Sequence, residues 1–232
     1  MKFVCISDTH NQHENLVFDG TEGDILVHTG DFSNFGNLLN VKNFISWFQE
    51  QPFPIKILIA GNHDVSLDKD LMKDHKAINE VIDTYVRQNS NLIYLDESGY
   101  DIDGIKIWGS AYTPGGSKQW AFQYFSNEEA ESRWSKIPED TDVLLTHGPP
   151  FGILDKYNGE NLGCPVLFKH VMERVAPVFH CFGHVHNTHG FEKCGLTTFI
   201  NSAMVLDDWA GKPPIVFEIE KDKYTKQLSY SI

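Results

Sequence analysis

The chain contains short runs of apolar residues bounded by polar residues, a pattern typical of strands that are buried on both faces. The strands predicted from it are Phe3–Ile6, Ile25–Val27, Ile55–Ile59, Leu92–Leu95, Ile105–Trp108, Val143–Leu145 and Val178–Phe182. Between these runs, apolar residues recur at the spacing of one helix face. The helices predicted from it are Leu38–Phe48, Leu71–Val86, Glu128–Trp134 and Val166–Val175.

Two stretches break the alternation of strand and helix. Asp-Gly and Cys-Gly pairs within Tyr100–Gly109 and Gly190–Ala203 favour β-hairpins there. The whole pattern predicts an α/β fold, with a mixed β-sheet sandwich flanked by helices. Because no linker, repeat or low-complexity tract divides the sequence, we expect a single domain over residues 1–232.

Side chains of the types that bind metal ions follow the ends of the predicted strands. They are Asp8, His10, Asp31, Asn62, His147, His184 and His186. In open α/β sheets, ligands bind at the C-terminal ends of the strands, so this placement predicts a site at that edge. The i, i+2 spacing of the first two residues and of the last two directs both side chains of each pair to one side of extended backbone.

The donor types in this set narrow the choice of metal. Two carboxylates and one amide provide oxygen, and four imidazoles provide nitrogen. Such a mixture suits Mn, Fe, Zn or Ni better than Ca, which prefers oxygen throughout. A carboxylate such as that of Asp31 has two oxygens and is able to bridge two ions.

Five motifs occur in order along the chain. They are Asp8-Thr9-His10, Gly30-Asp31, Gly61-Asn62-His63-Asp64, Thr146-His147-Gly148 and Gly183-His184-Val185-His186. From Phe3 to about Asn201, the sequence therefore resembles the calcineurin-like metallophosphoesterases. The longer stretches His28–Asp31, Ile59–His63 and Thr146–Pro150 resemble the metallophosphoesterase-domain-containing branch, known from animal brain proteins. That branch is associated with phosphodiester hydrolysis, including that of cyclic nucleotides.

The resemblance implies two divalent metal ions at the C-terminal ends of the strands, with Mn favoured and Fe, Zn, Ni or Mg as alternatives. It assigns one ion to Asp8, His10, Asp31 and His186, and the other to Asp31, Asn62, His147 and His184. Asp31 would bridge the ions. In such sites the ions lie about 3.5–4 Å apart and clamp the attacking and leaving oxygens of an in-line displacement. A hydroxide that bridges the ions would attack phosphorus.

The same resemblance implies that His63 protonates the leaving oxygen or stabilises its charge. Asp64 is expected to orient the His63 ring, because a hydrogen-bonded carboxylate fixes the tautomer of an imidazole. Both roles are hypotheses.

The residues that would contact substrate point to a diester. Phe35 stands where the related Ser/Thr protein phosphatases carry a phosphate-binding arginine, and an aromatic face suits a diester or nucleotide better than a dianionic monoester. The aromatic-rich segment 112–125 predicts a loop in which Trp120 or Phe122 would stack on a base, or would pack on its own domain. His189 follows a ligand pair by three residues and is a further candidate contact.

Other histidines in the sequence are expected to be structural. His28 and His180 lie in apolar strands and are expected to be buried, whereas His170 lies in a helical stretch and is expected to face solvent. His13 also follows a ligand pair by three residues, so both a substrate contact and a structural role stay open for it. Asn201 is expected to be either a support for a ligand or a turn residue.

The formal net charge of −13 and the lack of a basic cluster disfavour long nucleic acid as a partner. Two bound divalent ions would nevertheless make the pocket locally positive, which favours a small phosphoester substrate. The apolar runs are too short for a membrane span, and four cysteines without a C-x-x-C pair suit buried thiols in a reducing compartment. We therefore expect a cytoplasmic protein without a membrane partner. Its oligomeric state is left open.

Two alternatives to a phosphodiesterase are considered. One is a phosphomonoesterase, including a Ser/Thr protein phosphatase. The other is a non-catalytic metal-binding scaffold, which is disfavoured because all seven ligand positions and His63 carry suitable residues.

Overall fold

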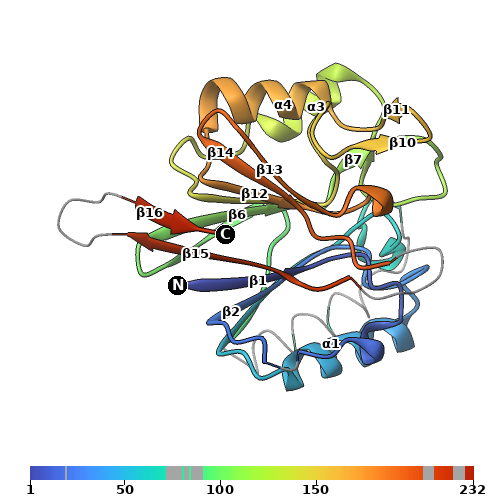
Figure 1. The fold of residues 1–232 in the computed structure, drawn as a ribbon. Helices are drawn as coiled ribbons and strands as arrows, with labels where there is room; N and C mark the ends of the chain where they lie inside the picture. The colour runs from blue at the N-terminus through green and yellow to red at the C-terminus, as the bar shows by residue number, and fades with distance from the viewer. Residues whose placement is uncertain (19, 72–79, 81–83, 85–90, 206–211, 222–227) are drawn as a thin grey trace.

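Two six-stranded β-sheets form the centre of the molecule, and helices lie outside them (Figure 1). The computed structural model describes residues 1–232 except 19, 72–79, 81–83, 85–90, 206–211 and 222–227. Most of the predicted helix Leu71–Val86 lies outside the described residues, as does His75 within it. The predicted α/β fold, a mixed-sheet sandwich with helices outside, is confirmed.

The first sheet has the strand order β16-β15-β1-β2-β3-β4. Its strands are β1 (Lys2–Ile6), β2 (Ile25–Thr29), β3 (Ile55–Ile59), β4 (Leu92–Tyr94), β15 (Ile215–Lys221) and β16 (Leu228–Ser231). Strands β1 to β4 pair in parallel, and β15 joins β1 in the antiparallel sense. Strands β15 and β16 were not predicted: the apolar run of β15, Ile215–Phe217, is short and follows two prolines, and charged residues alternate with Ile219 after it.

The second sheet has the order β13-β14-β12-β9-β6-β5. Its strands are β5 (Ser98–Ile102), β6 (Ile105–Ser110), β9 (Val143–Thr146), β12 (Phe179–Phe182), β13 (Gly190–Cys194) and β14 (Thr197–Asn201). The inner strands are parallel, and the antiparallel pairs β5–β6 and β13–β14 confirm both predicted hairpins. Two short ladders lie in loops: β7 (Thr113–Pro114) with β8 (Gln123–Tyr124), and β10 (Lys156–Tyr157) with β11 (Glu160–Asn161).

One hydrophobic core fills the space between the sheets. Phe179 of β12 stacks on Phe217 of β15 with ring centroids 3.9 Å apart, and the Sγ atoms of Cys5 and Cys181 lie 3.8 Å apart. Successive side chains of a strand point to opposite faces, so the neighbours of these inward residues pack outward under the helices. Burial on both faces explains why the strands read as continuous apolar runs.

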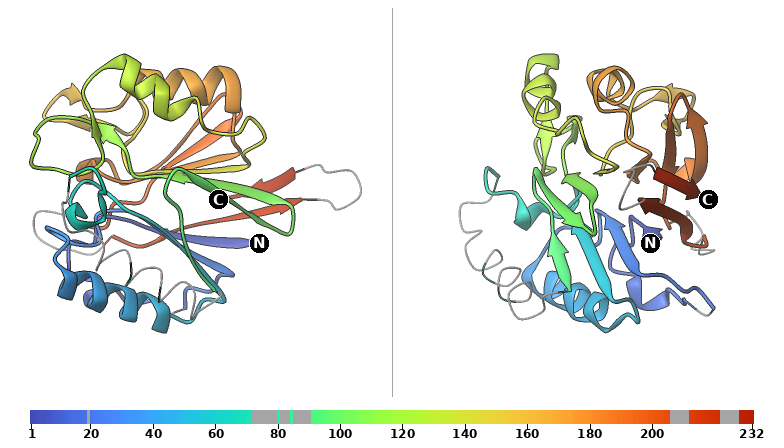
Figure 2. Two further views of the ribbon diagram at one scale, coloured as in Figure 1. Left: turned by 180° about the vertical axis from the view of Figure 1, so that it is seen from behind. Right: turned by 90° about the vertical axis from the view of Figure 1, so that its left-hand side faces the viewer.

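Helices cover the outer face of each sheet (Figures 1 and 2). Helix α1 (Leu38–Glu50) begins at Asn37, whose side chain accepts a hydrogen bond from the Asn40 backbone N–H. Its apolar stripe, which includes Phe44 and Phe48, is fully buried with the outward side chains of the first sheet. On the opposite side of the molecule lie α3 (Asn127–Trp134) and α4 (Pro165–His170), the second of which continues as a π-helical turn over Val171–Val175.

The C-terminal ends of the parallel strands of both sheets meet at one edge of the sandwich. A parallel bridge pairs Ser7, just after β1, with Ala203, just after β14. The Met204 backbone N–H also donates to the Ser7 carbonyl at 2.9 Å. Three 3-10 turns lie in the loops near this edge: η1 (His13–Asn15), η2 (Val65–Leu67) and η4 (His186–Thr188). The loops that carry the predicted ligands are thereby gathered on this edge.

Among the described residues, none of the helices has the length and apolar character that crossing a membrane requires.

Candidate metal centre

Asp8 is buried at the exit of β1 and links the two sheets. Its carboxylate accepts a hydrogen bond from the His184 backbone N–H, with both oxygens 3.0 Å from the nitrogen. A Cβ on Gly183 would lie 2.0 Å from the Asp8 Oδ2 atom. Only glycine therefore lets the loop after β12 approach the carboxylate so closely.

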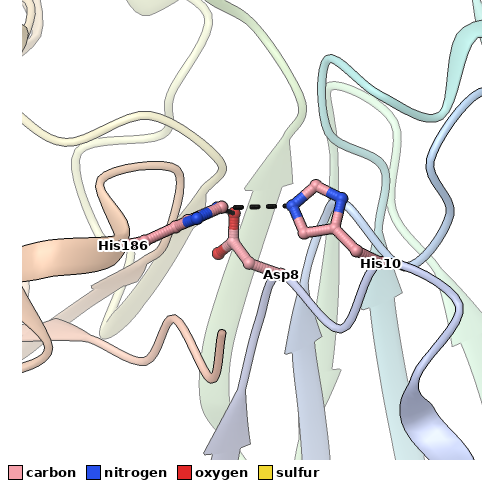
Figure 3. A group of neighbouring side chains, drawn as sticks. All are labelled: Asp8, His10 and His186. Atoms are coloured by element: carbon pink, nitrogen blue, oxygen red, sulfur yellow. Dashed lines mark hydrogen bonds and ion pairs between the residues drawn. The ribbon is translucent and has the colours of Figure 1, made fainter. Parts of the chain in front are cut away.

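His10 and His186 converge on this carboxylate from opposite sheets (Figure 3). The Nε2 atoms of the two rings lie 3.3 Å apart, and the His186 Nε2 lies 3.3 Å from the Asp8 Oδ1. The His10 Nε2 also lies 3.8 Å from the Asp31 Oδ2. Carboxylate oxygen and imidazole nitrogen thus surround one small volume with atoms that are able to ligate a cation.

A second group of donors lies around Asp31 and His147. The His147 Nε2 lies 3.2 Å from the Asp31 Oδ2 and 3.0 Å from the Asn62 Oδ1. The rings of His147 and His184 are 5.1 Å apart. The His147 Nδ1 lies 2.8 Å from the Thr29 carbonyl oxygen, which accepts its proton, so Nε2 is the ring nitrogen that faces the site.

The donors fit two ions that share Asp31. Three groups of ligand atoms each lie within 4.8 Å of one another: Asp8, His10 and His186; His10, Asp31 and His63; and Asp31, His147 and His184. Asp31 belongs to two of these groups, as a bridging carboxylate requires. All seven predicted ligands are therefore brought together, and their roles at individual ions stay predictions.

The backbone at the site adopts conformations that L-residues rarely adopt. Positive φ angles occur at Asp8 (53°), His10 (43°), Asp31 (54°) and His184 (67°). Such conformations cost on the order of 1–3 kcal/mol each and persist only where the surrounding structure enforces them. Their concentration at predicted ligands indicates that the fold holds these side chains in place at the expense of local stability.

The electrostatics of the cluster favour positive charge within it. Burial alone would raise the pKa of Asp8, but hydrogen bonding and charge from His186 outweigh it, and the pKa lies below its ordinary range. The pKa of Asp31 is also lowered, because the charge of His147 outweighs burial. Burial would lower the pKa of His147, yet the charge of Asp31 raises it to about 9. The same field that retains a proton on His147 would favour a metal cation.

His63 lies beside the cluster, but its orientation does not come from Asp64. The His63 Nδ1 lies 3.0 Å from the Asn34 carbonyl oxygen, and its backbone N–H donates to the Asp31 Oδ1 at 2.7 Å. The Asp64 carboxylate instead accepts hydrogen bonds from the Ser33 backbone and hydroxyl and from the Gly61 backbone. The expectation that Asp64 orients the ring is therefore corrected: its carboxylate binds the loops on which His63 lies.

Asp64 is also unlike an ordinary surface carboxylate. It is fully buried, and burial together with the nearby charge of Asp31 raises its pKa to about 7. Neither the Ser33 contact nor the Asn34 contact was predicted, because the sequence carries no local signal for a side chain that binds the backbone of a distant loop.

Two aromatic side chains continue outward from His63, and we call Phe35 and Trp120 together the aromatic shelf. The ring centroids of Trp120 and His63 lie 4.0 Å apart. Phe35 stacks against Trp120 with ring centroids 5.8 Å apart and an interplanar angle of 13°. Phe35 is 68% exposed, so the shelf is open to solvent. The structure thus places both predicted contacts beside the site.

Phe122 does not lie on this shelf. Its ring is 3% exposed and packs edge-on against Tyr112, so the expectation that it reaches substrate is corrected. Its backbone N–H donates to the Asp68 carboxylate at 2.6 Å, and the Ala121 N–H donates to the Asn62 carbonyl at 3.0 Å. These bonds turn the Phe122 side chain inward and fix the Trp120 loop to the loop that carries a predicted ligand.

On the other flank of the site, Asn201 supports the loop that carries His184 and His186. Its amide donates to the Val185 carbonyl at 2.9 Å, and its Oδ1 accepts from the Ala203 N–H at 3.0 Å. His189 is partly buried, with its Nδ1 2.9 Å from the Ala203 carbonyl oxygen. A contact between His189 and substrate stays a prediction.

For the other histidines, the structure confirms some of the expected burial states and contradicts one. His28 and His180 are fully buried, as predicted, and each ring lies within hydrogen-bonding distance of a threonine hydroxyl. His13 is buried against Phe44 and is structural. The expectation that His170 faces solvent is wrong: it is 7% exposed and pairs with Glu131 of α3, because the short helix α4 packs against α3.

Comparisons with known proteins place the chain in a family. The model of the calcineurin-like phosphoesterase family matches residues 1–188. The chain therefore belongs to the calcineurin-like phosphoesterases, whose members are metallophosphoesterases. It is similar to human metallophosphoesterase domain-containing protein 1, with 34% identity over 94% of this chain and 71% of that protein. It is also similar to the Caenorhabditis elegans UPF0046 protein K07C11.7, with 38% identity over 95% of this chain and 76% of that protein.

Among solved structures, the protein TT1561 of Thermus thermophilus shares the fold. The match has a TM-score of 0.63 and 13% identity, and it covers 99% of this chain and 97% of the other. The predicted resemblance to the family and to its metallophosphoesterase-domain-containing branch is confirmed.

Proposed function

We propose that this protein is a di-metal phosphodiesterase that hydrolyses small or nucleotide-like diesters, with cyclic nucleotides among the candidates. The observation that carries the proposal is the aromatic shelf of Phe35 and Trp120, which lies directly beside His63 and the metal centre. Membership of the calcineurin-like phosphoesterases supports phosphoester hydrolysis more broadly.

Two divalent ions, with Mn favoured, would supply a Lewis acid and an activated water when they are bound. The residues that would hold them are carboxylates that stay ionised and imidazoles such as His147, whose tautomer is fixed by a backbone carbonyl. The mixed oxygen and nitrogen donor set fits Mn, Fe, Zn or Ni, with Mg as a further alternative.

His63 has the geometry of a proton donor to the leaving oxygen. Because the Asn34 carbonyl accepts the proton on Nδ1, the Nε2 atom is left to exchange a proton with substrate. The contact of the ring with Trp120 holds its plane in position. A fixed ring with one free nitrogen is the arrangement that general acid catalysis requires.

A diester suits this site better than a monoester because of the charge each carries. A dianionic monoester is bound most strongly by a bidentate guanidinium. Among the described arginines, Arg133 pairs with Glu97 and lies over Tyr112, whereas Arg174 donates to the Trp134 and Ile137 carbonyls. Arg87 lies outside the described residues. The aromatic shelf instead offers a neutral surface for an aryl or base group.

The charge distribution supports a small substrate. The formal net charge of −13 repels long polyanions, whereas two divalent ions would attract one phosphate at the site. Long nucleic acid is accordingly disfavoured as a substrate, and the cytoplasmic location stays a prediction.

The test compares hydrolysis of bis-p-nitrophenyl phosphate and p-nitrophenyl phosphate by the Mn-loaded protein. We expect a higher kcat/KM for the diester. A clear preference for the monoester would favour the phosphomonoesterase alternative, and no turnover of either compound at saturating Mn would favour the non-catalytic scaffold.

A further inference from the structure

Lys212 lies beside the metal centre at His186, whereas the aromatic shelf adjoins it at His63. Its ammonium group donates a hydrogen bond to the backbone carbonyl of His186. Ring contacts connect the two features through the site: the ring centroids of His63 and His10 are 4.7 Å apart, and those of His10 and His186 are 5.2 Å apart. Trp120 adjoins His63 at one end of this row, and Lys212 adjoins His186 at the other.

The positive charge of Lys212 acts on the neighbouring residue His189. It helps to lower the pKa of His189, although burial is the larger cause. Burial lowers the pKa of Lys212 itself, and the negative charge of Asp8 opposes that effect. Among the described residues, its hydrogen-bond partner is a neutral carbonyl, which accepts from one of three ammonium N–H groups.

Lys212 also lines a cavity of about 390 Å³, which is roughly the size of a small-molecule site. One wall contains Asn15 and Thr21, and the other contains Met204 and the two prolines that follow Lys212. Lys212 is the charged member of the described lining, and the amide and hydroxyl add neutral hydrogen-bonding groups. The backbone of Met204 is bonded to the Ser7 carbonyl, so this wall is attached to the strand end that carries Asp8.

The hydrogen bond from Lys212 to the His186 carbonyl determines which part of a substrate Lys212 would contact. The imidazole of His186 reaches inward to Asp8, whereas Lys212 binds the carbonyl of the same residue. The ammonium therefore lies beside the metal position and does not occupy it. A group that contacts Lys212 would be attached to the reacting phosphate through one of its ester arms.

We propose that Lys212 and this cavity bind a second phosphate of the substrate, carried on the ester arm opposite the arm that lies on the aromatic shelf. This inference rests on the proposed phosphodiesterase function and narrows its substrate class. The preferred substrates are nucleotide diesters that bear a further phosphate. The side chain of Lys212 provides a positive charge for phosphate binding, whereas Phe35, at the position of the arginine in the related protein phosphatases, provides none.

The experiment measures binding without turnover. Isothermal titration calorimetry on the Mn-loaded protein compares a hydrolysis-resistant, phosphorothioate-linked thymidine dinucleotide that bears a terminal 3′-phosphate (the bisphosphate) with the same dinucleotide without that terminal phosphate (the monophosphate). We expect the wild type to bind the bisphosphate about tenfold more tightly, which corresponds to about 1.4 kcal/mol. Lys212→Met should remove this preference and leave the affinity for the monophosphate within about twofold. Lys212→Arg should restore it.

Lys193→Met is the matched control, since Lys193 lies on the exposed strand β13 with its ammonium bonded to the Tyr230 hydroxyl. It removes the same charge and should retain the preference. Equal affinity of the wild type for both nucleotides would overturn the proposal. A Lys212→Met protein that loses affinity for both nucleotides equally would also overturn it, because Lys212 would then act only through His186.

The two proposals fail separately. If the bisphosphate preference is present and depends on Lys212 while no diester is hydrolysed, the proposed function fails and the anion site stands. If diesters are hydrolysed without that preference, the anion site fails alone. The Mn content of each variant, measured by plasma mass spectrometry, shows that the metal centre is intact.

Discussion

The ring of Trp120 lies 4.0 Å from the ring of His63, although 57 positions of sequence separate the two residues. Two hydrogen bonds hold the Trp120 loop in this position: the Ala121 N–H donates to the Asn62 carbonyl, and the Phe122 N–H donates to the Asp68 carboxylate. The aromatic loop is thus built onto the same loop as a predicted metal ligand and the predicted acid. A substrate that lies on the shelf would therefore be held in a fixed position relative to both Asn62 and His63.

The shelf predicts a specific effect of Trp120→Ala. We expect the KM for the p-nitrophenyl ester of thymidine 5′-monophosphate to rise about tenfold, because stacking on an aromatic side chain contributes roughly 1–3 kcal/mol per base. The KM for glycerophosphocholine, a diester that has neither a base nor an aryl group, should change little. Phe125→Ala is the control, because Phe125 is 56% exposed in the same loop segment and is not part of the shelf. Equal increases in KM for the two esters would contradict a role in stacking.

His63→Ala tests the predicted general acid. Turnover of diesters with alkyl leaving groups should fall by about 10²–10⁴-fold, because such leaving oxygens need a proton in the transition state. Turnover of activated aryl diesters should fall much less. The measurement is kcat at saturating Mn for both classes, with metal content checked in parallel. An equal loss for both classes would exclude the acid assignment.

Asp64→Asn separates the observed role of Asp64 from the expected one. The substituted amide would set an N–H₂ group against one of the N–H donors of Gly61 and Ser33, so we expect the free energy of unfolding to fall by about 1–3 kcal/mol. Any loss of turnover should be similar for all leaving groups. The checks are urea unfolding and the two diester classes used for His63. A selective loss for poor leaving groups at unchanged stability would return Asp64 to the role of orienting His63.

The buried histidines His28 and His180 predict that acid destabilises the fold. Burial lowers the pKa of each to about 3 from the ordinary value of 6.5. Below pH 6.5 the unfolded chain binds these protons while the folded chain does not, so stability is fully present above pH 6.5 and falls as the pH drops toward 3. Between pH 7 and pH 5, each of the two histidines lowers the free energy of unfolding by about 2 kcal/mol.

His180→Gln should remove one of these two contributions. The His180 Nε2 lies 2.8 Å from the Thr146 hydroxyl, which donates to the Gly148 carbonyl, and the glutamine amide is able to replace the histidine donor. The difference in unfolding free energy between pH 7 and pH 5 should therefore shrink by about 2 kcal/mol in urea titrations. An unchanged pH dependence would mean that His180 does not contribute to acid sensitivity.

The sequence allowed the central strands and the ligand set to be predicted, because both follow from local rules. Burial on both faces produces apolar runs, and ligand types at strand exits such as Asp8 and Asp31 can be read without knowledge of the loops. Strand β15 was not predicted, because its apolar run Ile215–Phe217 is short, follows two prolines and is succeeded by charged residues that alternate with Ile219.

Side-chain directions within the loops could not be predicted in the same way. Phe122 has a positive φ of 49° and turns inward, so its position next to Trp120 and Ala121 in the sequence gave no indication that it belongs to the core. Asp64 and Lys212 bind the main chain of loops that are distant in sequence. Their partners are backbone groups, which every residue carries, so no residue type marks them.

The proposed chemistry depends on two metal ions that share Asp31, and crystals grown with Mn would reveal them. An anomalous difference map should show two peaks about 3.5–4 Å apart, with one Asp31 oxygen or both between them. One peak should adjoin Asp8 and His186, and the other should adjoin Asn62 and His147. A single peak, or peaks that do not contact Asp31, would exclude a di-metal centre bridged by Asp31.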